Sequence, residues 1–265
     1  MVSRNKGICR LSIVPVRATA SHSSEMVTQL LFGDHFEVVE TSADTQWLKI
    51  KIRFDGYIGW IASNQFSDIS DAYFEQLNSA DFKVSTDLVS KIMYNKEYIN
   101  IILGSMLPIA SSELFNLEEQ LAFNGESKNL SERKGSEYLK ATAKKYLGAP
   151  YLWGGKTPFG IDCSGFVQQV FKICGYQLSR DASQQEKQGA LVKKITDTQL
   201  GDLVFFANEK MNIDHVGIIL EEGKVIHASG MVRIDTLDEE GIFVKTKNVY
   251  SHKLFSIKRI LRAEK

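Results

Sequence analysis

The chain has 265 residues, of which 43% are hydrophobic and 24% are charged, so it is long enough for one or two globular domains. Its 32 basic and 32 acidic residues give a formal net charge of +0, which argues against a dedicated nucleic-acid-binding protein and against a polybasic protein of membrane surfaces. No stretch approaches the ~20 apolar residues of a transmembrane helix. We therefore expect a globular protein with neither nucleic acid nor a membrane as its partner; its protein partners stay unknown.

The first part of the chain has the texture of a small all-β module. Short segments rich in β-branched and aromatic residues are separated by turn residues such as Gly33 and Asp34. A more polar bridge follows over residues 68–90, and a polar stretch at 126–135 predicts a linker. The predicted strand segments are 11–16, 29–32, 36–40, 47–52 and 56–61, and strand-rich texture returns at 99–107 and 117–125.

A helix is predicted to begin at Cys163. Asp162 is a favoured N-cap residue, and apolar residues then recur at helical spacing as far as Cys174, before Gly175. Cys163 falls in the first turn, where free backbone N–H groups and the helix dipole favour a thiolate. The same N–H groups can stabilise an oxyanion, so Cys163 is a candidate nucleophile.

A nucleophilic cysteine needs a base, and two later predicted strands each contain one histidine, His215 and His227. Taken alone, each histidine could equally have a structural role. The occurrence of both together with Cys163 favours a catalytic role. A three-residue loop at 221–223 would pair Gly217 with His227 and leave the two histidines as diagonal neighbours on one face. The remaining histidines have no partner pattern and are predicted to be surface residues: His22, His35 and His252.

A series of motifs resembles the NlpC/P60 family of cysteine peptidases, which cut bacterial cell-wall peptides. The resemblance spans residues 135–262 and implies an α+β, papain-like domain, in which the helix that carries the cysteine packs on an antiparallel sheet. It also implies that Cys163 is the nucleophile, His215 the base and His227 the orienting third residue. The motifs are Tyr-Leu-Trp-Gly-Gly at 151–155, Asp-Cys-Ser-Gly-Phe at 162–166, Arg-Asp-Ala-Ser-Gln-Gln at 180–185, Leu-Gly-Asp-Leu-Val-Phe-Phe at 200–206, His-Val-Gly-Ile at 215–218 and Ile-His-Ala-Ser at 226–229.

Residues 29–34 and 56–61 resemble a bacterial SH3-type (SH3b) domain, a small all-β barrel. The strand-rich segments after residue 98 weakly resemble a second, divergent SH3b unit. An SH3b domain before the peptidase is typical of family members that act as γ-D-glutamyl-L-diamino acid endopeptidases, in which the first SH3b domain helps to wall the active site. The predicted domains are residues 1–67 (SH3b), 68–134 (divergent SH3b-like unit and linker) and 135–265 (peptidase).

This resemblance implies that Glu25, Tyr57 and Asp162 hold the free amine of an N-terminal L-Ala. Carboxylates around one ammonium form charge-assisted hydrogen bonds that an internal peptide bond cannot provide. Without the resemblance, Glu25 is a surface charge and Tyr57 a surface aromatic residue. Further candidate substrate-binding residues are Tyr151, Ser164, Asp181, Ala182 and Ser183; Ser164 is equally an ordinary first-turn residue, Asp181 alternatively pairs with Arg180, and Ala182 stands where some members carry a hydroxyl.

The predicted function is hydrolysis of the γ-D-Glu–diamino acid amide bond in murein-derived peptides, through a thioester and without a metal or organic cofactor. Three alternatives stay open. The first alternative is a catalytically inactive module that binds cell-wall peptides. The second is an acyltransferase that uses the same three residues. The third alternative is a Cys–His–His metal site, which no Cys-x-x-Cys or His-x-x-x-His pair supports.

The predicted location is the cytoplasm, with a role in recycling of wall peptides. The first residues show no apolar run of signal-peptide length. If the start of the sequence was trimmed, the protein is instead secreted or periplasmic. Three cysteines exclude a full disulfide framework, and Cys9 and Cys174 are predicted to be core thiols in a reducing compartment.

Overall fold

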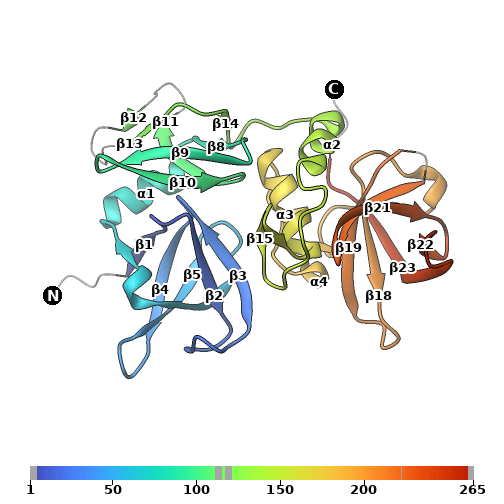
Figure 1. The fold of residues 1–265 in the computed structure, drawn as a ribbon, viewed down its shortest axis with the longest axis horizontal. Coiled ribbons are helices and arrows are strands. Elements are labelled where there is room, and N and C mark those ends of the chain that lie inside the picture. Colours follow the sequence, from blue (N-terminus) through green and yellow to red (C-terminus); the bar gives the residue numbers. More distant parts are fainter. Residues whose placement is uncertain (1–4, 111–114, 117–120, 222, 262–265) are drawn as a thin grey trace. The chain divides into compact units, whose positions relative to one another are not determined.

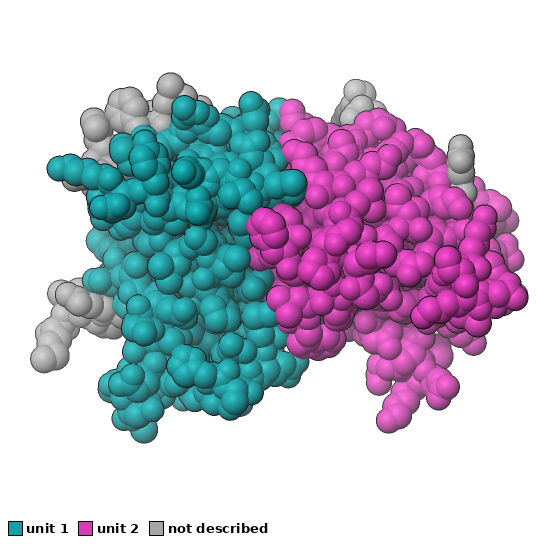
Figure 2. Space-filling view, viewed as in Figure 1, with its two compact units in different colours: residues 1–132 teal, residues 133–265 magenta. Residues whose placement is uncertain are grey.

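The computed structural model describes residues 5–110, 115–116, 121–221 and 223–261 (Figure 1). The chain forms two compact units, residues 1–132 and residues 133–265 (Figure 2). Among the described residues, no helix is long and apolar enough to cross a membrane. The predicted boundary at residue 67, within the first unit, stays a prediction.

The first unit begins with a seven-stranded antiparallel sheet that curves around a core containing Val14, Ile50 and Ile61. All five strand segments predicted before residue 62 overlap strands of this sheet, because their alternating apolar residues face that core. The spatial order is β3-β2-β6-β5-β4-β1-β7. The elements are β1 (Lys6–Ile8), β2 (Ile13–Arg17), β3 (Met26–Leu31), β4 (His35–Thr41), β5 (Trp47–Ile52), β6 (Ile58–Ala62), the 3₁₀ turn η1 (Ser63–Gln65) and β7 (Ser67–Asp68).

The polar bridge after this sheet contains a helix, α1 (Asp71–Ser79), which the sequence pattern did not predict. Ser70 caps it by accepting a hydrogen bond from Tyr73 N at 3.1 Å. His35 is buried and its Nε2 contacts Asn78 Oδ1 of α1 at 3.0 Å, so the prediction of a surface residue was wrong there. Its burial depends on α1, which explains the error.

Two small sheets complete the first unit. One has the order β10-β9-β13-β12 and the other the order β11-β8-β14. The linker predicted from residue 126 onward is wrong at its start, because β14 pairs with β8. Residues 117–120 of the predicted strand-rich segment lie outside the described residues. The strands are β8 (Phe82–Ser85), β9 (Val89–Tyr94), β10 (Glu97–Ile102), β11 (Met106–Ala110), β12 (Phe115–Asn116), β13 (Leu121–Phe123) and β14 (Ser127–Asn129).

The second unit combines three helices with a seven-stranded antiparallel sheet, in the order β17-β23-β18-β19-β20-β21-β22. An additional pairing of β22 with β23 closes six of these strands into a barrel. The elements are α2 (Ser136–Lys144), β15 (Lys156–Thr157), β16 (Gly160–Ile161), α3 (Cys163–Ile173), α4 (Ala182–Gln185), β17 (Ala190–Leu191), η2 (Ile195–Asp197), β18 (Leu203–Ala207), β19 (Ile213–Ile219), β20 (Lys224–Ser229), β21 (Met231–Leu237), β22 (Gly241–Val244) and β23 (Val249–Arg259).

The helix α3 begins at Cys163, as predicted, and is buried along its whole length. Asp162 fixes this start, because its Oδ1 accepts a hydrogen bond from Gly165 N at 2.6 Å. The helix packs against β19 and β20 of the barrel. This packing brings the start of α3 to the strands that carry the two histidines. All three cysteines are buried and none forms a disulfide.

Candidate active site

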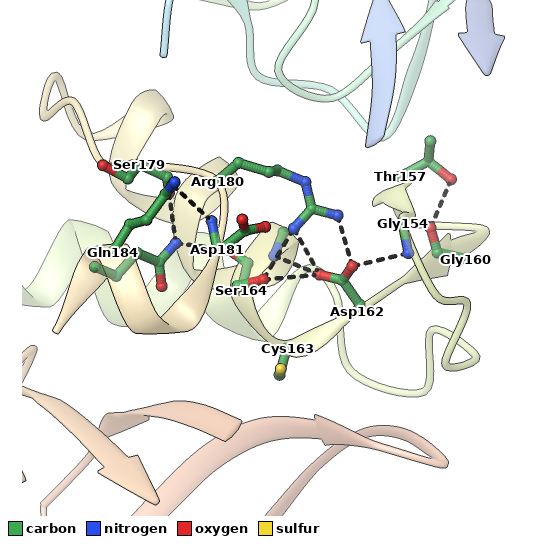
Figure 3. A network of polar contacts seen from close by, with 12 residues as sticks. Gly154, Thr157, Gly160, Asp162, Cys163, Ser164, Ser179, Arg180, Asp181 and Gln184 are labelled. Atoms are coloured by element: carbon green, nitrogen blue, oxygen red, sulfur yellow. Dashed lines mark hydrogen bonds and ion pairs between the residues drawn. The ribbon is translucent and has the colours of Figure 1, made fainter. Parts of the chain in front are cut away.

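The thiol of Cys163 faces the barrel. Its Sγ lies 3.9 Å from the carbonyl oxygen of Asp214 in β19, and only 6% of the residue is exposed. Figure 3 shows the sulfur pointing away from the polar cluster around Asp162 and toward the orange strands. Burial, and then the charge of Asp162, raise the pKa of the Cys163 thiol to about 12. The helix-start argument predicted the opposite direction; desolvation outweighs it, so the thiol is protonated at neutral pH.

A line of three side chains runs through the barrel end beside Cys163. Nε2 of His215 lies 2.8 Å from Nδ1 of His227, and Nε2 of His227 lies 3.0 Å from Oδ2 of Asp235. These side chains come from three neighbouring strands, β19, β20 and β21. We call the line His215–His227–Asp235 the histidine relay.

The hydrogen bonds of the relay fix the tautomer of both rings. The carboxylate of Asp235 only accepts, so His227 carries its proton on Nε2 and presents the lone pair of Nδ1. That lone pair accepts from His215, so the proton of His215 is on Nε2. The remaining nitrogen of His215, Nδ1, then carries a lone pair. A base with this lone pair can take the proton of a thiol.

Burial keeps both rings of the relay neutral. It lowers the pKa of His227 to about 4, against the opposing effect of its hydrogen bond to Asp235. Burial also lowers the pKa of His215 well below its ordinary value, and His252 and His227 lower it further. Burial alone would raise the pKa of Asp235, but hydrogen bonds from Arg233 and His227 outweigh it and lower that pKa. The resting site is therefore a neutral thiol beside a neutral base.

The register of the β19–β20 hairpin brings the two histidines together as predicted. Gly217 pairs with His227, and Leu220 N donates to Lys224 O at 2.7 Å, which matches a three-residue loop. Gly223 ends that loop with φ at +64°, the left-handed conformation that glycine adopts without strain. Glu222, also in the predicted loop, lies outside the described residues.

Gly217 makes room for the relay. A Cβ built on this residue would lie 2.5 Å from Cγ2 of Val225 and 3.1 Å from Cβ of His227. Any larger residue at position 217 would therefore displace one of these side chains. The glycine of the His-Val-Gly-Ile motif thus has a steric role directly opposite His227.

Two residues of the site were missed from the sequence. Asp235 lies on β21, two residues after Arg233, which pairs with His227, so it is a diagonal neighbour of that histidine. Extending the predicted register from the β19–β20 hairpin to the next strand would have found it. The ring of His252 in β23 stacks on His215, with centroids 4.0 Å apart and an interplanar angle of 24°. The prediction of a surface position for His252 was wrong: the residue is half-buried, because β18 pairs with β23 on one side and with β19 on the other and so brings the two rings together.

On the helix side of Cys163, Asp162 forms a buried charged cluster with Arg180 (Figure 3). Nη1 of Arg180 donates to Oδ1 of Asp162 at 3.0 Å and to Oγ of Ser164 at 2.9 Å. Gly154 N donates to Oδ2 of Asp162 at 2.9 Å. Only 1% of Arg180 is exposed. This cluster ties the start of α3 to the loop before β15 and to the segment before α4.

The other predicted substrate-binding residues of the second unit lie around this cluster. Burial, and then the charges of Cys163 and Asp162, raise the pKa of Tyr151, so its hydroxyl keeps a proton to donate. Ser164 is buried, and its Oγ is engaged by Arg180. Asp181 is the N-cap residue of α4, whose first two residues are the buried Ala182 and the exposed Ser183.

Glu25 and Tyr57 belong to the first unit. Glu25 is exposed and directly precedes β3, and its carbonyl oxygen accepts a hydrogen bond from Ala18 N at 2.9 Å. Tyr57 directly precedes β6 and is half-buried against the core of the first sheet. Their predicted contact with substrate stays a prediction.

Three histidines are close enough to be considered as metal ligands. The nitrogens of His215, His227 and His252 lie within 4.8 Å of one another. A metal ion binds in the plane of each imidazole ring, however, and the nearly parallel stack of His215 on His252 offers no point in both planes within the ~2 Å of a metal–nitrogen bond. The geometry therefore favours proton transfer over metal binding among these described residues.

Comparisons with known proteins identify the family of this chain. A model of the NlpC/P60 family matches residues 148–251, and a model described as a bacterial dipeptidyl-peptidase Sh3 domain matches residues 16–66. The chain is 31% identical over 249 residues to a gamma-D-glutamyl-L-lysine dipeptidyl-peptidase of Bacillus subtilis, with 88% of this chain and 80% of the relative covered. The chain belongs to the NlpC/P60 family.

Further comparisons extend the likeness of this NlpC/P60 protein over both units. A gamma-D-glutamyl-L-lysine dipeptidyl-peptidase of Bacillus cereus is 27% identical, with 78% of this chain and 68% of the relative covered. The crystal structure of an NlpC/P60 family protein from Bacillus cereus shares the fold, with a TM-score of 0.80 at 21% identity, and covers 97% of this chain and 100% of that chain. The predicted fold class, a papain-like α+β domain preceded by an SH3b domain, is confirmed. As an NlpC/P60 protein, the chain is a cysteine peptidase.

Proposed function

We propose that this peptidase hydrolyses the γ-D-glutamyl–diamino acid amide bond of murein-derived peptides that carry a free N-terminal L-Ala. The observation that carries the proposal is the histidine relay beside a nucleophilic thiol at a helix start. The choice of bond is supported by the names of the relatives that align with most of the chain.

In the proposed reaction, Sγ of Cys163 attacks the γ-carbonyl carbon of D-Glu while the thiol proton moves to Nδ1 of His215. Backbone N–H groups at the start of α3 and the hydroxyl of Tyr151 donate hydrogen bonds to the oxyanion. The C–N bond then breaks, and protonated His215 gives its proton to the leaving amine. His215 next deprotonates a water molecule, whose oxygen attacks the thioester and releases the thiol.

The relay suits this sequence of steps because a neutral resting pair must form a transient imidazolium. The imidazolium of His215 is stabilised through His227, whose far nitrogen is held by the carboxylate of Asp235. Because this positive charge exists only during the reaction, stabilising it lowers the energy barrier and leaves the energy of the resting state unchanged.

Recognition of a free amine is the finer part of the proposal. The family resemblance assigns Glu25, Tyr57 and Asp162 to the ammonium of L-Ala. Such a requirement would confine the enzyme to peptides already released from the wall. This fits a role in recycling, and we propose the cytoplasm as its compartment, which cell fractionation would test.

The test is mass spectrometry of the products of L-Ala-γ-D-Glu-L-Lys, with its N-terminus free or acetylated. We expect L-Ala-γ-D-Glu and free lysine from the free peptide, a rate at least about 10-fold lower from the blocked one, and no turnover by Cys163→Ala. Equal rates on both peptides would remove the amine requirement but leave the peptidase.

Two alternatives predict other outcomes of the same experiment. Binding without turnover by the wild type would indicate a module that only recognises wall peptides. A new amide, formed when an amine nucleophile is added, would indicate an acyltransferase. Full activity of Cys163→Ala would contradict the mechanism altogether.

A further inference from the structure

The second unit has a pocket of about 850 Å³ at the barrel end that carries the relay. Its lining comes from the end of β18 and the connection to β19 (residues 206–209, 211 and 214), from residues 239–240, and from residues 250–255 of β23. All the lining residues belong to the second unit and lie within its described part. The pocket plays no part in the mechanism derived above.

Two lining residues connect this pocket to the reacting groups. Asp214 lies directly before His215, and its carbonyl oxygen is the group 3.9 Å from Sγ of Cys163. His252 lines the pocket and stacks on the ring of His215. The pocket is therefore lined by two residues that contact the reacting groups, Asp214 beside Cys163 and His252 beside His215.

The leaving group of the proposed reaction has to lie on that side. His215 takes the thiol proton and must deliver it to the amine that departs, so the departing residue sits within hydrogen-bond distance of its ring during the reaction. The remainder of this residue then extends past His215. The pocket bordered by Asp214 and His252 is a cavity close to this position.

The chemistry of the lining suits a long apolar side chain that ends in a positive charge. Met211, Tyr250 and Phe255 expose 67%, 45% and 42% of their surface, which is high for apolar residues that share one pocket. The carboxylates around these residues outnumber the ammonium group of Lys253. The acidic residues that line the pocket are Glu209, Asp214, Glu239 and Glu240.

We propose that this pocket is the leaving-group subsite, and that it selects a departing residue whose side chain carries an ammonium, as lysine does. The inference rests on the proposed function and deepens it. Methylene groups of the side chain pack on the exposed apolar residues, and the ammonium meets the carboxylates in charge-assisted hydrogen bonds. The amine-binding residues predicted for L-Ala concern the opposite end of the substrate.

The test compares two peptides, L-Ala-γ-D-Glu-L-Lys and the same peptide with the lysine ε-amine acetylated. We expect the wild type to have a kcat/KM about 10-fold higher for the free amine, because two or more exposed ion pairs contribute. The double variant Glu209→Gln, Glu239→Gln should reduce this ratio to about 2-fold. Circular dichroism and urea denaturation of this double variant should match those of the wild type, which shows that it is folded.

A matched control removes the same charge elsewhere in the unit. Glu137 and Glu221 are exposed and both contact Lys140, outside the pocket. The double variant Glu137→Gln, Glu221→Gln should keep the wild-type ratio. A wild-type ratio near 1, or a ratio unchanged by the pocket variant, would overturn the subsite while leaving the peptidase in place. Failure of the wild type to cleave either peptide would overturn the proposed function, and the subsite with it.

Discussion

The polar side chains on the helix side of Cys163 and those on the barrel side are both buried, but they are bonded differently. On the helix side, the carboxylate of Asp162 is surrounded by donors from Arg180 and from backbone N–H groups. On the barrel side, each ring of the histidine relay uses one nitrogen for each neighbour. The first cluster is built around the ion pair of Arg180 with Asp162, whereas the two rings of the second are neutral.

This difference corresponds to two roles: one cluster positions the start of the helix, and the other can transfer a proton. A carboxylate that accepts hydrogen bonds on both oxygens is held in one orientation, so the helix-side cluster positions the start of α3. The neutral ring of His215 has a lone pair with which it can take up a proton during the reaction and release it again. On one side of the nucleophile, hydrogen bonds hold a charge pair in place in spite of burial, and on the other side burial suppresses charge.

The largest effect should come from breaking the helix-side cluster. Arg180→Met leaves the buried carboxylate of Asp162 without its counter-charge, and we expect a loss of about 3–5 kcal/mol in the free energy of unfolding. Urea denaturation measures it. The double variant Arg180→Met, Asp162→Asn should recover part of the loss, since no isolated charge remains. A loss under about 1 kcal/mol in the single variant would show that the pair is not held as described.

A pH effect on stability distinguishes the barrel side. The pKa of His227 is about 4 in the folded protein and about 6.5 when unfolded. Between these values the unfolded chain binds the extra proton, so stability falls as pH decreases from 6.5 to 4, by about 3 kcal/mol in total. His227→Gln should remove this part of the slope in urea titrations. His22→Gln, which changes an exposed histidine, should leave the slope unchanged.

The reactivity of the nucleophile tests whether the resting pair is neutral. A thiol with a pKa of about 12 has little thiolate at pH 7.5. After allowance for its greater nucleophilicity, alkylation by iodoacetamide should be roughly 50-fold slower than for an ordinary cysteine. The rate should rise with pH throughout the range from 6 to 9. A plateau below pH 7 would instead reveal a thiolate–imidazolium pair, as the helix-start argument from sequence predicts.

The smallest effect concerns the far end of the relay. Asp235→Asn removes the charge that stabilises the imidazolium but keeps an oxygen that can accept from His227, so we expect kcat to fall by roughly 10-fold with little change in KM. Nitrogen chemical shifts of His215 report its tautomer directly. An unchanged kcat together with an unchanged tautomer would exclude Asp235 from the relay.

Much of the barrel side could be predicted because it depends on local pairing. The loop length after β19 sets the register, and the register sets which face His215 and His227 share. The position of Asp235 could have been predicted by extending the same register across one more hairpin, from β20 to β21. His252 could not be placed in this way, because β23 reaches β19 through β18, in a pairing between segments far apart in the sequence that no turn signal indicates.

The helix side was predicted only in part. The N-cap role of Asp162 follows from its residue type, and the helix begins where that role requires. The ion pair of Asp162 with Arg180 joins a residue before α3 to one after it, and so could not be read from local spacing. The sequence instead suggested the adjacent Asp181 as the partner of Arg180. The direction of the Cys163 pKa was also wrong, because a sequence pattern conveys a helix dipole but not the depth of burial that opposes it.

The close approach at Gly217 has a consequence for telling active homologues from inactive ones. A protein that has exchanged this glycine for a larger residue could keep its cysteine and both histidines and still have lost the alignment between them, since a Cβ there meets Val225 and His227. A search of sequences for the cysteine and the two histidines alone would count such a protein as an active enzyme. The loss of catalysis would be recorded at a position that contributes no functional group.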